Sequence, residues 1–143
     1  MMTRYNSDFY GWTQEQAGLL RSGDLSQLDT ENLLEEIEAM GRSERRELRS
    51  RLEILLAHLL KWRYQADRRG RSWELTIEEQ RDKAIDCLQE SPSLKNKLDE
   101  HLGKAYTAAR RLAEKETLIN RNIFPETCPW TFEQIMDENF LPE

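Results

Sequence analysis

The sequence predicts an all-α fold, a single-domain helical bundle of five or six helices around a central helix at 44–64. Leu48–Tyr64 carries apolar residues at the i, i+4, i+7, i+8 and i+11 spacing of a buried helical face, and Ile54 and Leu60 lie outside that face. A helix that is apolar over so much of its circumference must be covered on several sides. No five-residue run alternates as a strand does, and β-branched residues are scarce.

The length, charge and hydropathy of the chain exclude several classes of protein. With 143 residues it has the size of one ordinary domain, so we expect a single helical domain over 1–143. A net charge of -6 disfavours nucleic acid as a partner, because nucleic-acid binding usually needs a basic face. Residues 1–10 lack the apolar stretch of a signal peptide. No apolar run is close to the length of about 18 residues that a membrane-spanning helix needs. We therefore expect a cytoplasmic protein without a membrane partner.

Capping signals predict where helices begin. Thr13–Gln16 and Thr131–Gln134 each match a capping box, in which a threonine and a glutamine exchange hydrogen bonds with the backbone. Thr76–Glu79 is a third capping box, with glutamate in place of glutamine, although Ser72 could start that helix one turn earlier. Ser91–Pro92 supplies an N-cap followed by proline at the first helical position.

Between these signals we expect five main helices and a short terminal one: Thr13–Arg21, Thr30–Met40, Glu44–Tyr64, Trp73–Gln89, Pro92–Glu116 and Phe132–Glu138. Gly41 suits the end of the second helix, and Ser43 suits the start of the third. An unbroken helix over 30–64 would be about 50 Å long at 1.5 Å per residue, which is too long for so small a domain. The sequence therefore predicts a break at 41–43.

The C-terminal segment is expected to pack on the bundle. Trp130 precedes the capping threonine, so it can contact Ile135 as a hydrophobic staple. We also expect Phe132 or Phe140 to pack against the other helices, so that this end of the chain does not dangle.

The chain has two histidines and two cysteines, and neither pair forms a known site. We expect His58 to be a core side chain bonded to a backbone carbonyl or a carboxylate; a metal ligand, a proton-transfer group and an interface residue are the alternatives. Leucines stand three residues before His58 and His101, so the Glu-x-x-His pairs of helical di-iron sites are absent. Cys87 and Cys128 lack the spacing of a zinc site, and no nucleotide-binding or hydrolase motif occurs. The sequence thus predicts no catalytic residue, no metal and no cofactor.

The strongest functional candidate is the segment 61–73, here called the arginine–aromatic loop. It holds five cations, one acid and three aromatic residues in a chain of net charge -6. Arginines beside aromatic rings can hold phosphates or pair with the carboxylates of a partner. The alternative is that these arginines neutralise acids of the same chain. The candidate anion or partner site comprises His58, Trp62, Arg68, Arg69, Arg71 and Trp73.

Several strings along the chain resemble the bacterial domain-of-unknown-function family twenty-nine: Asp8–Trp12, Glu35–Glu38, Met40–Gly41, His58–Trp62, Ser72–Trp73, Ser91–Leu94 and Phe124–Trp130. They are spread over nearly the whole chain. Ala66 stands where members of the family often have proline, which bears on the rigidity of the loop. The resemblance implies a compact helical bacterial protein, and it supplies no activity and no catalytic residue.

From these observations we expect a non-enzymatic cytoplasmic interaction protein that presents the arginine–aromatic loop to an acidic protein partner. The alternative is an uncharacterised enzyme or small-ligand-binding protein that uses His58, Trp62 and the segment 68–73. A deep pocket containing His58 and an arginine would favour the alternative, whereas a flat surface there would favour the interaction protein. The sequence leaves the oligomeric state open.

Overall fold

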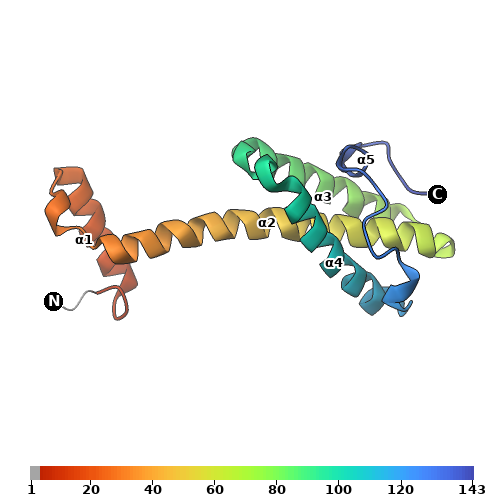
Figure 1. The fold of residues 1–143 in the computed structure, drawn as a ribbon, viewed down its shortest axis with the longest axis horizontal. Helices are drawn as coiled ribbons and strands as arrows, with labels where there is room; N and C mark the ends of the chain where they lie inside the picture. Colours follow the sequence, from red (N-terminus) through yellow and green to blue (C-terminus); the bar gives the residue numbers. More distant parts are fainter. Residues whose placement is uncertain (1–3) are drawn as a thin grey trace. The chain divides into compact units, whose positions relative to one another are not determined.

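The computed structural model describes residues 4–143, and within them all regular structure is helical (Figure 1). The α-helices are α1 (Phe9–Ser22), α2 (Thr30–Tyr64), α3 (Arg71–Glu90), α4 (Leu98–Thr117) and α5 (Phe132–Met136). Short 3-10 helices stand between them: η1 (Leu25–Gln27), η2 (Ala66–Arg68), η3 (Pro92–Lys97) and η4 (Arg121–Ile123). The predicted all-α class is confirmed. None of the described helices combines the length and apolar character that crossing a membrane requires.

The chain divides into two compact units, one up to Arg42 and one from Ser43. The N-terminal unit contains α1, η1 and the first part of α2. The C-terminal unit contains the rest of α2 and every later element. The single domain expected from the chain length stays a prediction.

The helix α2 shows that the predicted break at 41–43 is wrong. It is one helix of 35 residues, where the sequence predicts two, and it passes through Gly41 and Ser43. The only glycine with a positive φ in residues 4–143 is Gly23, at the end of α1. A helix of this length is compatible with a small core, because one core does not have to cover the whole helix. None of the α2 residues before Leu48 is buried, so its first part needs no such cover.

Replacing Gly41 tests the continuity of α2. A Cβ atom added at Gly41 meets no atom within 4 Å, and glycine inside a helix is about 0.5–1 kcal/mol less stable than alanine. We therefore expect Gly41→Ala to stabilise this part of α2 by about 0.5–1 kcal/mol, measured by hydrogen exchange of the amides around residue 41. A left-handed glycine that ended a helix would give the opposite sign, so lower protection in the alanine variant would contradict a continuous α2.

Two helices begin earlier than their capping signals predict. α1 begins at Phe9, where the Asp8 side chain accepts a hydrogen bond from the Gly11 amide (3.0 Å), so a capping box at Thr13 is wrong. α3 begins at Arg71, before both Ser72 and the Thr76 box. Packing explains the first case, because the Phe9 ring stacks on Trp12 one helical turn later, with 5.6 Å between ring centroids.

The last capping box is present as predicted. Thr131 Oγ1 accepts a hydrogen bond from the Gln134 amide (3.2 Å), and Gln134 Oε1 accepts one from the Thr131 amide (2.9 Å). α5 ends at Met136, two residues before the predicted end. Pro92 does stand at a helix start, but the expected helix from this residue divides into η3 and α4.

The core of the C-terminal unit surrounds the second part of α2, as the periodicity predicts. Six leucines of this helix are at most 1 % exposed: Leu48, Leu52, Leu55, Leu56, Leu59 and Leu60. Ile77 and Ala84 of α3 belong to the same core, and α4 contributes the small residues Ala105, Ala109 and Ala113. α3 and α4 therefore enclose this part of α2 (Figure 1).

The C-terminal segment completes this core. Trp130 and Ile135 are buried in it, and Phe140 packs against it with its ring at an edge-to-face angle to Trp130, 6.3 Å between centroids. The predicted packing of Phe132 or Phe140 on the bundle is confirmed, since both rings contact the core. The segment from 130 onward is thus part of the folded C-terminal unit.

Candidate functional site

The arginine–aromatic loop comprises the end of α2, η2 and the start of α3, all within the C-terminal unit. Its aromatic residues face inward. Trp62 belongs to the buried core, and Tyr64 and Trp73 pack against that core while partly exposed. Packing of the three rings therefore fixes the position of the loop, and a cation of the loop lies near each ring.

Lys61 is neutralised within its own unit. Its Nζ lies 2.6 Å from Glu116 Oε2 of α4 and 4.8 Å from the centroid of the Trp73 ring. The residue is 8 % exposed, so it meets little solvent. Lys61 thus pairs with an acid of its own unit and is not available to a partner.

Arg69 is also held by the loop itself. Its Nε donates a 2.6 Å hydrogen bond to the backbone carbonyl of Trp62, and its guanidinium lies 5.3 Å from the centroid of the Trp62 ring. The carbonyl belongs to the last turn of α2, where helix carbonyls lack an intrahelical partner and favour a cation. Arg69 therefore caps α2 and fastens the loop to it.

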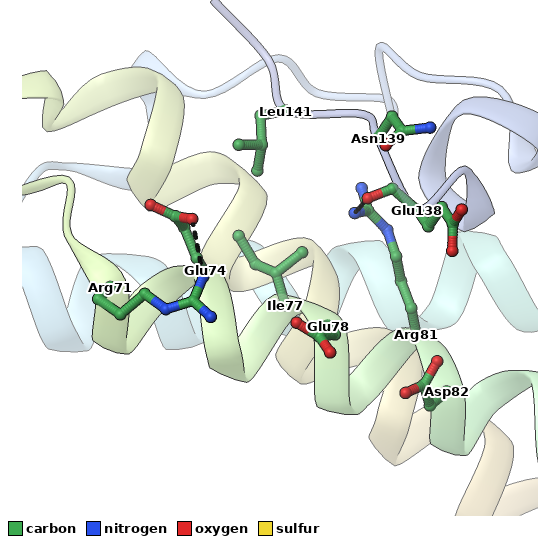
Figure 2. A pocket seen from close by; sticks show the side chains of 9 residues that line it. All are labelled: Arg71, Glu74, Ile77, Glu78, Arg81, Asp82, Glu138, Asn139 and Leu141. Atoms are coloured by element: carbon green, nitrogen blue, oxygen red, sulfur yellow. Dashed lines mark hydrogen bonds and ion pairs between the residues drawn. The ribbon is translucent and has the colours of Figure 1, made fainter.

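Three arginines of the loop remain exposed. Arg68 has no carboxylate within 4.0 Å among residues 4–143. The Arg71 side chain is 72 % exposed, and its 3.3 Å ion pair with Glu74 lies at the surface (Figure 2). Arg63 is exposed beside the Tyr64 ring, 5.6 Å from its centroid. Because exposed ion pairs contribute about 0–1 kcal/mol, these arginines contribute little to stability.

His58 hydrogen-bonds a backbone carbonyl, as predicted, but its side chain is not in the core, where the sequence places it. It is half-buried, and its Nδ1–H donates to the Ile54 carbonyl at 2.9 Å. Burial lowers the pKa of the imidazole below its usual value, and the nearby charge of Lys61 acts in the same direction. No hydrogen bond or ion pair in the described chain joins His58 to the arginines of the loop.

His101 is buried, at 2 % exposure, and contacts a cation. Its Nδ1 accepts a 3.0 Å hydrogen bond from Arg49 Nε, so this nitrogen carries no proton. Burial and the charge of Arg49 both lower the pKa of the imidazole. Within residues 4–143, no three His, Cys, Asp or Glu side chains are grouped so that they could hold a metal ion.

Two surface hollows of the C-terminal unit lie away from His58. One, of about 550 Å³, lies between α3 and the C-terminal segment, and Figure 2 shows the side chains that line it, Arg71 and Leu141 among them. The other, of about 290 Å³, is lined by residues of α2 and α3 such as Glu44 and Lys83. Neither is lined by His58, Trp62 or Arg68, so neither is the pocket that would favour a small-ligand site.

Arg81 attaches the C-terminal segment to α3, a role that was not predicted from the sequence. This arginine is 4 % exposed, and its guanidinium donates hydrogen bonds to the backbone carbonyls of Ile135, Glu138 and Phe140. A signal was present in the sequence, because Arg81 follows Ile77 by four residues and thus lies on the apolar face of α3. A cation on such a face indicates a buried partner.

Comparison with known proteins gives one match. The family described as "Domain of unknown function DUF29" matches residues 4–141, nearly the whole chain. No curated protein and no solved structure matches the chain. The resemblance noted in the sequence is therefore confirmed, and this all-helical chain belongs to the DUF29 family, a domain of unknown function.

Proposed function

We propose that this protein is a non-enzymatic interaction protein of the bacterial cytoplasm, and that its arginine–aromatic loop binds an acidic segment of a protein partner. One observation carries the proposal: the loop has two kinds of cation. Lys61 and Arg69 are held by their own unit, whereas Arg63, Arg68 and Arg71 are exposed.

The contacts that hold the loop against the C-terminal unit favour binding by the exposed arginines. Arg69 holds the loop to the Trp62 carbonyl, and Trp73 packs against the core on the other side of Gly70. Arg68 and Arg71 therefore project from a backbone that is attached at both ends. A binding group on an ordered backbone loses less conformational entropy when a partner arrives, which favours association.

The start of α3 adds a positive partial charge close to Arg71. Gly70 is the N-cap residue and has no side chain to accept a hydrogen bond from the first amides of the helix. Such amides and the helix dipole favour a carboxylate at this end. Glu74 in the first turn already pairs with Arg71, so a partner carboxylate competes with it and the affinity is expected to be moderate.

The chemistry of the surface favours an acidic protein over the other candidates. A nucleic acid would be repelled by the rest of the surface, because the whole chain has a net charge of -6 although the loop is basic. The enzyme or small-ligand alternative gains no support from His58, which hydrogen-bonds its own helix. A short acidic segment needs only the few cations that the loop exposes.

A short fluorescent poly-glutamate peptide tests the proposal. We expect the full chain to bind it, with an affinity that falls as salt screens exposed charges. Arg63→Gln/Arg68→Gln/Arg71→Gln should weaken binding about tenfold, because three contacts of about 0.5 kcal/mol each are lost. The melting temperature should change little, since exposed substitutions usually stay within about 0.5 kcal/mol each.

Arg69→Gln is the structural comparison. It removes the hydrogen bond to Trp62 and the ring contact, so it should cost about 1–2 kcal/mol of stability. The proposal is wrong if the triple variant binds poly-glutamate as tightly as the parent chain. It is also wrong if the triple variant loses more stability than Arg69→Gln does.

A further inference from the structure

The N-terminal unit exposes an unusual number of apolar side chains. Of the eleven large hydrophobic residues exposed in the described chain, seven lie in this unit: Phe9, Tyr10, Leu20, Leu25, Leu34, Ile37 and Met40. Within residues 4–42, only Trp12 and Gln16 are buried. A unit this small buries little apolar surface by itself, and exposed apolar patches commonly mark interaction sites.

Three of these side chains form one stripe on the first part of α2. Leu34, Ile37 and Met40 are 57 %, 58 % and 60 % exposed. At about 100° per residue they fall within an arc of about 120°, and Gly41 lies inside the same arc without adding a side chain. A stripe of this width is the face by which one helix usually packs on another. We call these three residues the apolar stripe.

Carboxylates lie along one edge of the apolar stripe. Glu31 and Glu38 are exposed, and at about 100° per residue both lie within about 60° of Leu34. Neither has an ion pair with a described residue, whereas the neighbouring Glu35 pairs with Arg42 at 3.4 Å. Two carboxylates beside an apolar surface are thus available to cations of a partner.

The net charge of the N-terminal unit also favours a basic partner. Residues 4–42 contain eight acids and three arginines, a net charge of -5, whereas the residues from Ser43 onward contribute only -1. A second copy of this unit would therefore meet like charge at the stripe, which disfavours a symmetric dimer through it. A partner with cations beside an apolar face complements both properties.

We propose that the apolar stripe is the docking site of a basic amphipathic helix from another protein. Its apolar residues would cover Leu34, Ile37 and Met40, and its lysines or arginines would pair with Glu31 and Glu38. Binding of an amphipathic helix by an apolar surface through residues one turn apart is a common mode of recognition. This site uses another surface and a partner of opposite charge, so it is independent of the arginine–aromatic loop.

A designed helical peptide with leucines on one face and lysines on the other is a suitable probe. We expect the full chain to bind it and the amide signals of residues 31–41 to shift in NMR spectra. A peptide of the same composition in scrambled order should bind at least tenfold more weakly, because it has the charge without the apolar face. A peptide with glutamate in place of lysine should not bind.

Two variants of the full chain locate the site. Ile37→Asn/Met40→Asn should weaken binding of the leucine–lysine peptide at least tenfold, and Glu31→Gln/Glu38→Gln should remove much of its salt dependence. The matched control is Leu118→Asn/Ile123→Asn, which replaces two exposed apolar residues of the C-terminal unit (87 % and 61 % exposed) and should leave binding unchanged.

Two results would overturn the proposal. The first is equal affinity of the peptide for the parent chain and for Ile37→Asn/Met40→Asn. The second is a parent chain that dimerises in sedimentation analysis, does not bind the peptide, and becomes monomeric in Ile37→Asn/Met40→Asn, because a second copy would then occupy the stripe.

Discussion

Arg81→Leu is expected to lower the free energy of unfolding of the C-terminal unit by at least about 3 kcal/mol. The guanidinium is 4 % exposed and donates to three backbone carbonyls, at 2.7 Å from Ile135, 3.4 Å from Glu138 and 2.5 Å from Phe140. Hydrogen bonds of charged groups contribute about 1.5–3 kcal/mol each, and a buried carbonyl left unpaired adds a penalty. Urea denaturation followed by tryptophan fluorescence measures the change.

Arg71→Leu is the matched control for Arg81. It changes the same residue type on the same helix, at the edge of the same hollow (Figure 2). Its side chain is 72 % exposed, so the expected loss is at most about 0.5 kcal/mol.

Deleting residues 130–143 should destabilise the C-terminal unit more than Arg81→Leu does, because Trp130 and Ile135 leave the core as well. A truncated monomer that melts at the parent temperature would contradict the packing of this segment.

Trp12→Ala is expected to unfold the N-terminal unit. Trp12 is 3 % exposed, its Nε1–H donates to Asp29 Oδ2 at 2.9 Å, and the rings of Tyr5 and Phe9 lie against it. Replacing a buried tryptophan by alanine costs about 3–5 kcal/mol, and this unit has little other buried surface to offset the loss. Hydrogen exchange should therefore show lost protection in α1.

Trp12→Phe separates packing from hydrogen bonding. It keeps an aromatic ring and loses the bond to Asp29, so we expect a cost of about 1–2 kcal/mol and a unit that stays folded. In Trp12→Ala, the amides of the second part of α2 should keep their protection, since their core is formed within the C-terminal unit. Unchanged protection of α1 in Trp12→Ala would show that the tryptophan does not hold this unit together.

The central part of the fold could be predicted because its signal is periodic. The leucines from Leu48 to Leu60 define a face that only a covered helix satisfies, and the structure buries them. The predicted break at 41–43 is wrong because a glycine and a serine two residues apart give the same local signal inside a helix as between two helices. What distinguishes the two cases is the packing of the flanking segments, which the sequence alone does not show.

The candidate site could be predicted as a segment but not residue by residue. Arg68 and Arg69 are adjacent in sequence, yet Arg69 reaches the Trp62 carbonyl and Arg68 stays exposed. Which of the two arginines reaches the carbonyl depends on the exact residue at which α2 ends and on the direction of η2. A shift of one residue would exchange their positions. Arg81 differs in this respect, because its place on the apolar face of α3 could have been recognised from the spacing.

The most direct test of the proposed function compares two triple variants of equal charge. Arg63→Gln/Arg68→Gln/Arg71→Gln removes the exposed cations of the loop, and Arg45→Gln/Arg46→Gln/Arg111→Gln removes three exposed cations elsewhere in the C-terminal unit. Both make the net charge three units more negative than -6. We predict that only the loop variant loses about tenfold in affinity for poly-glutamate. Equal losses in the two variants would show that overall charge, and not the loop, attracts the acidic ligand.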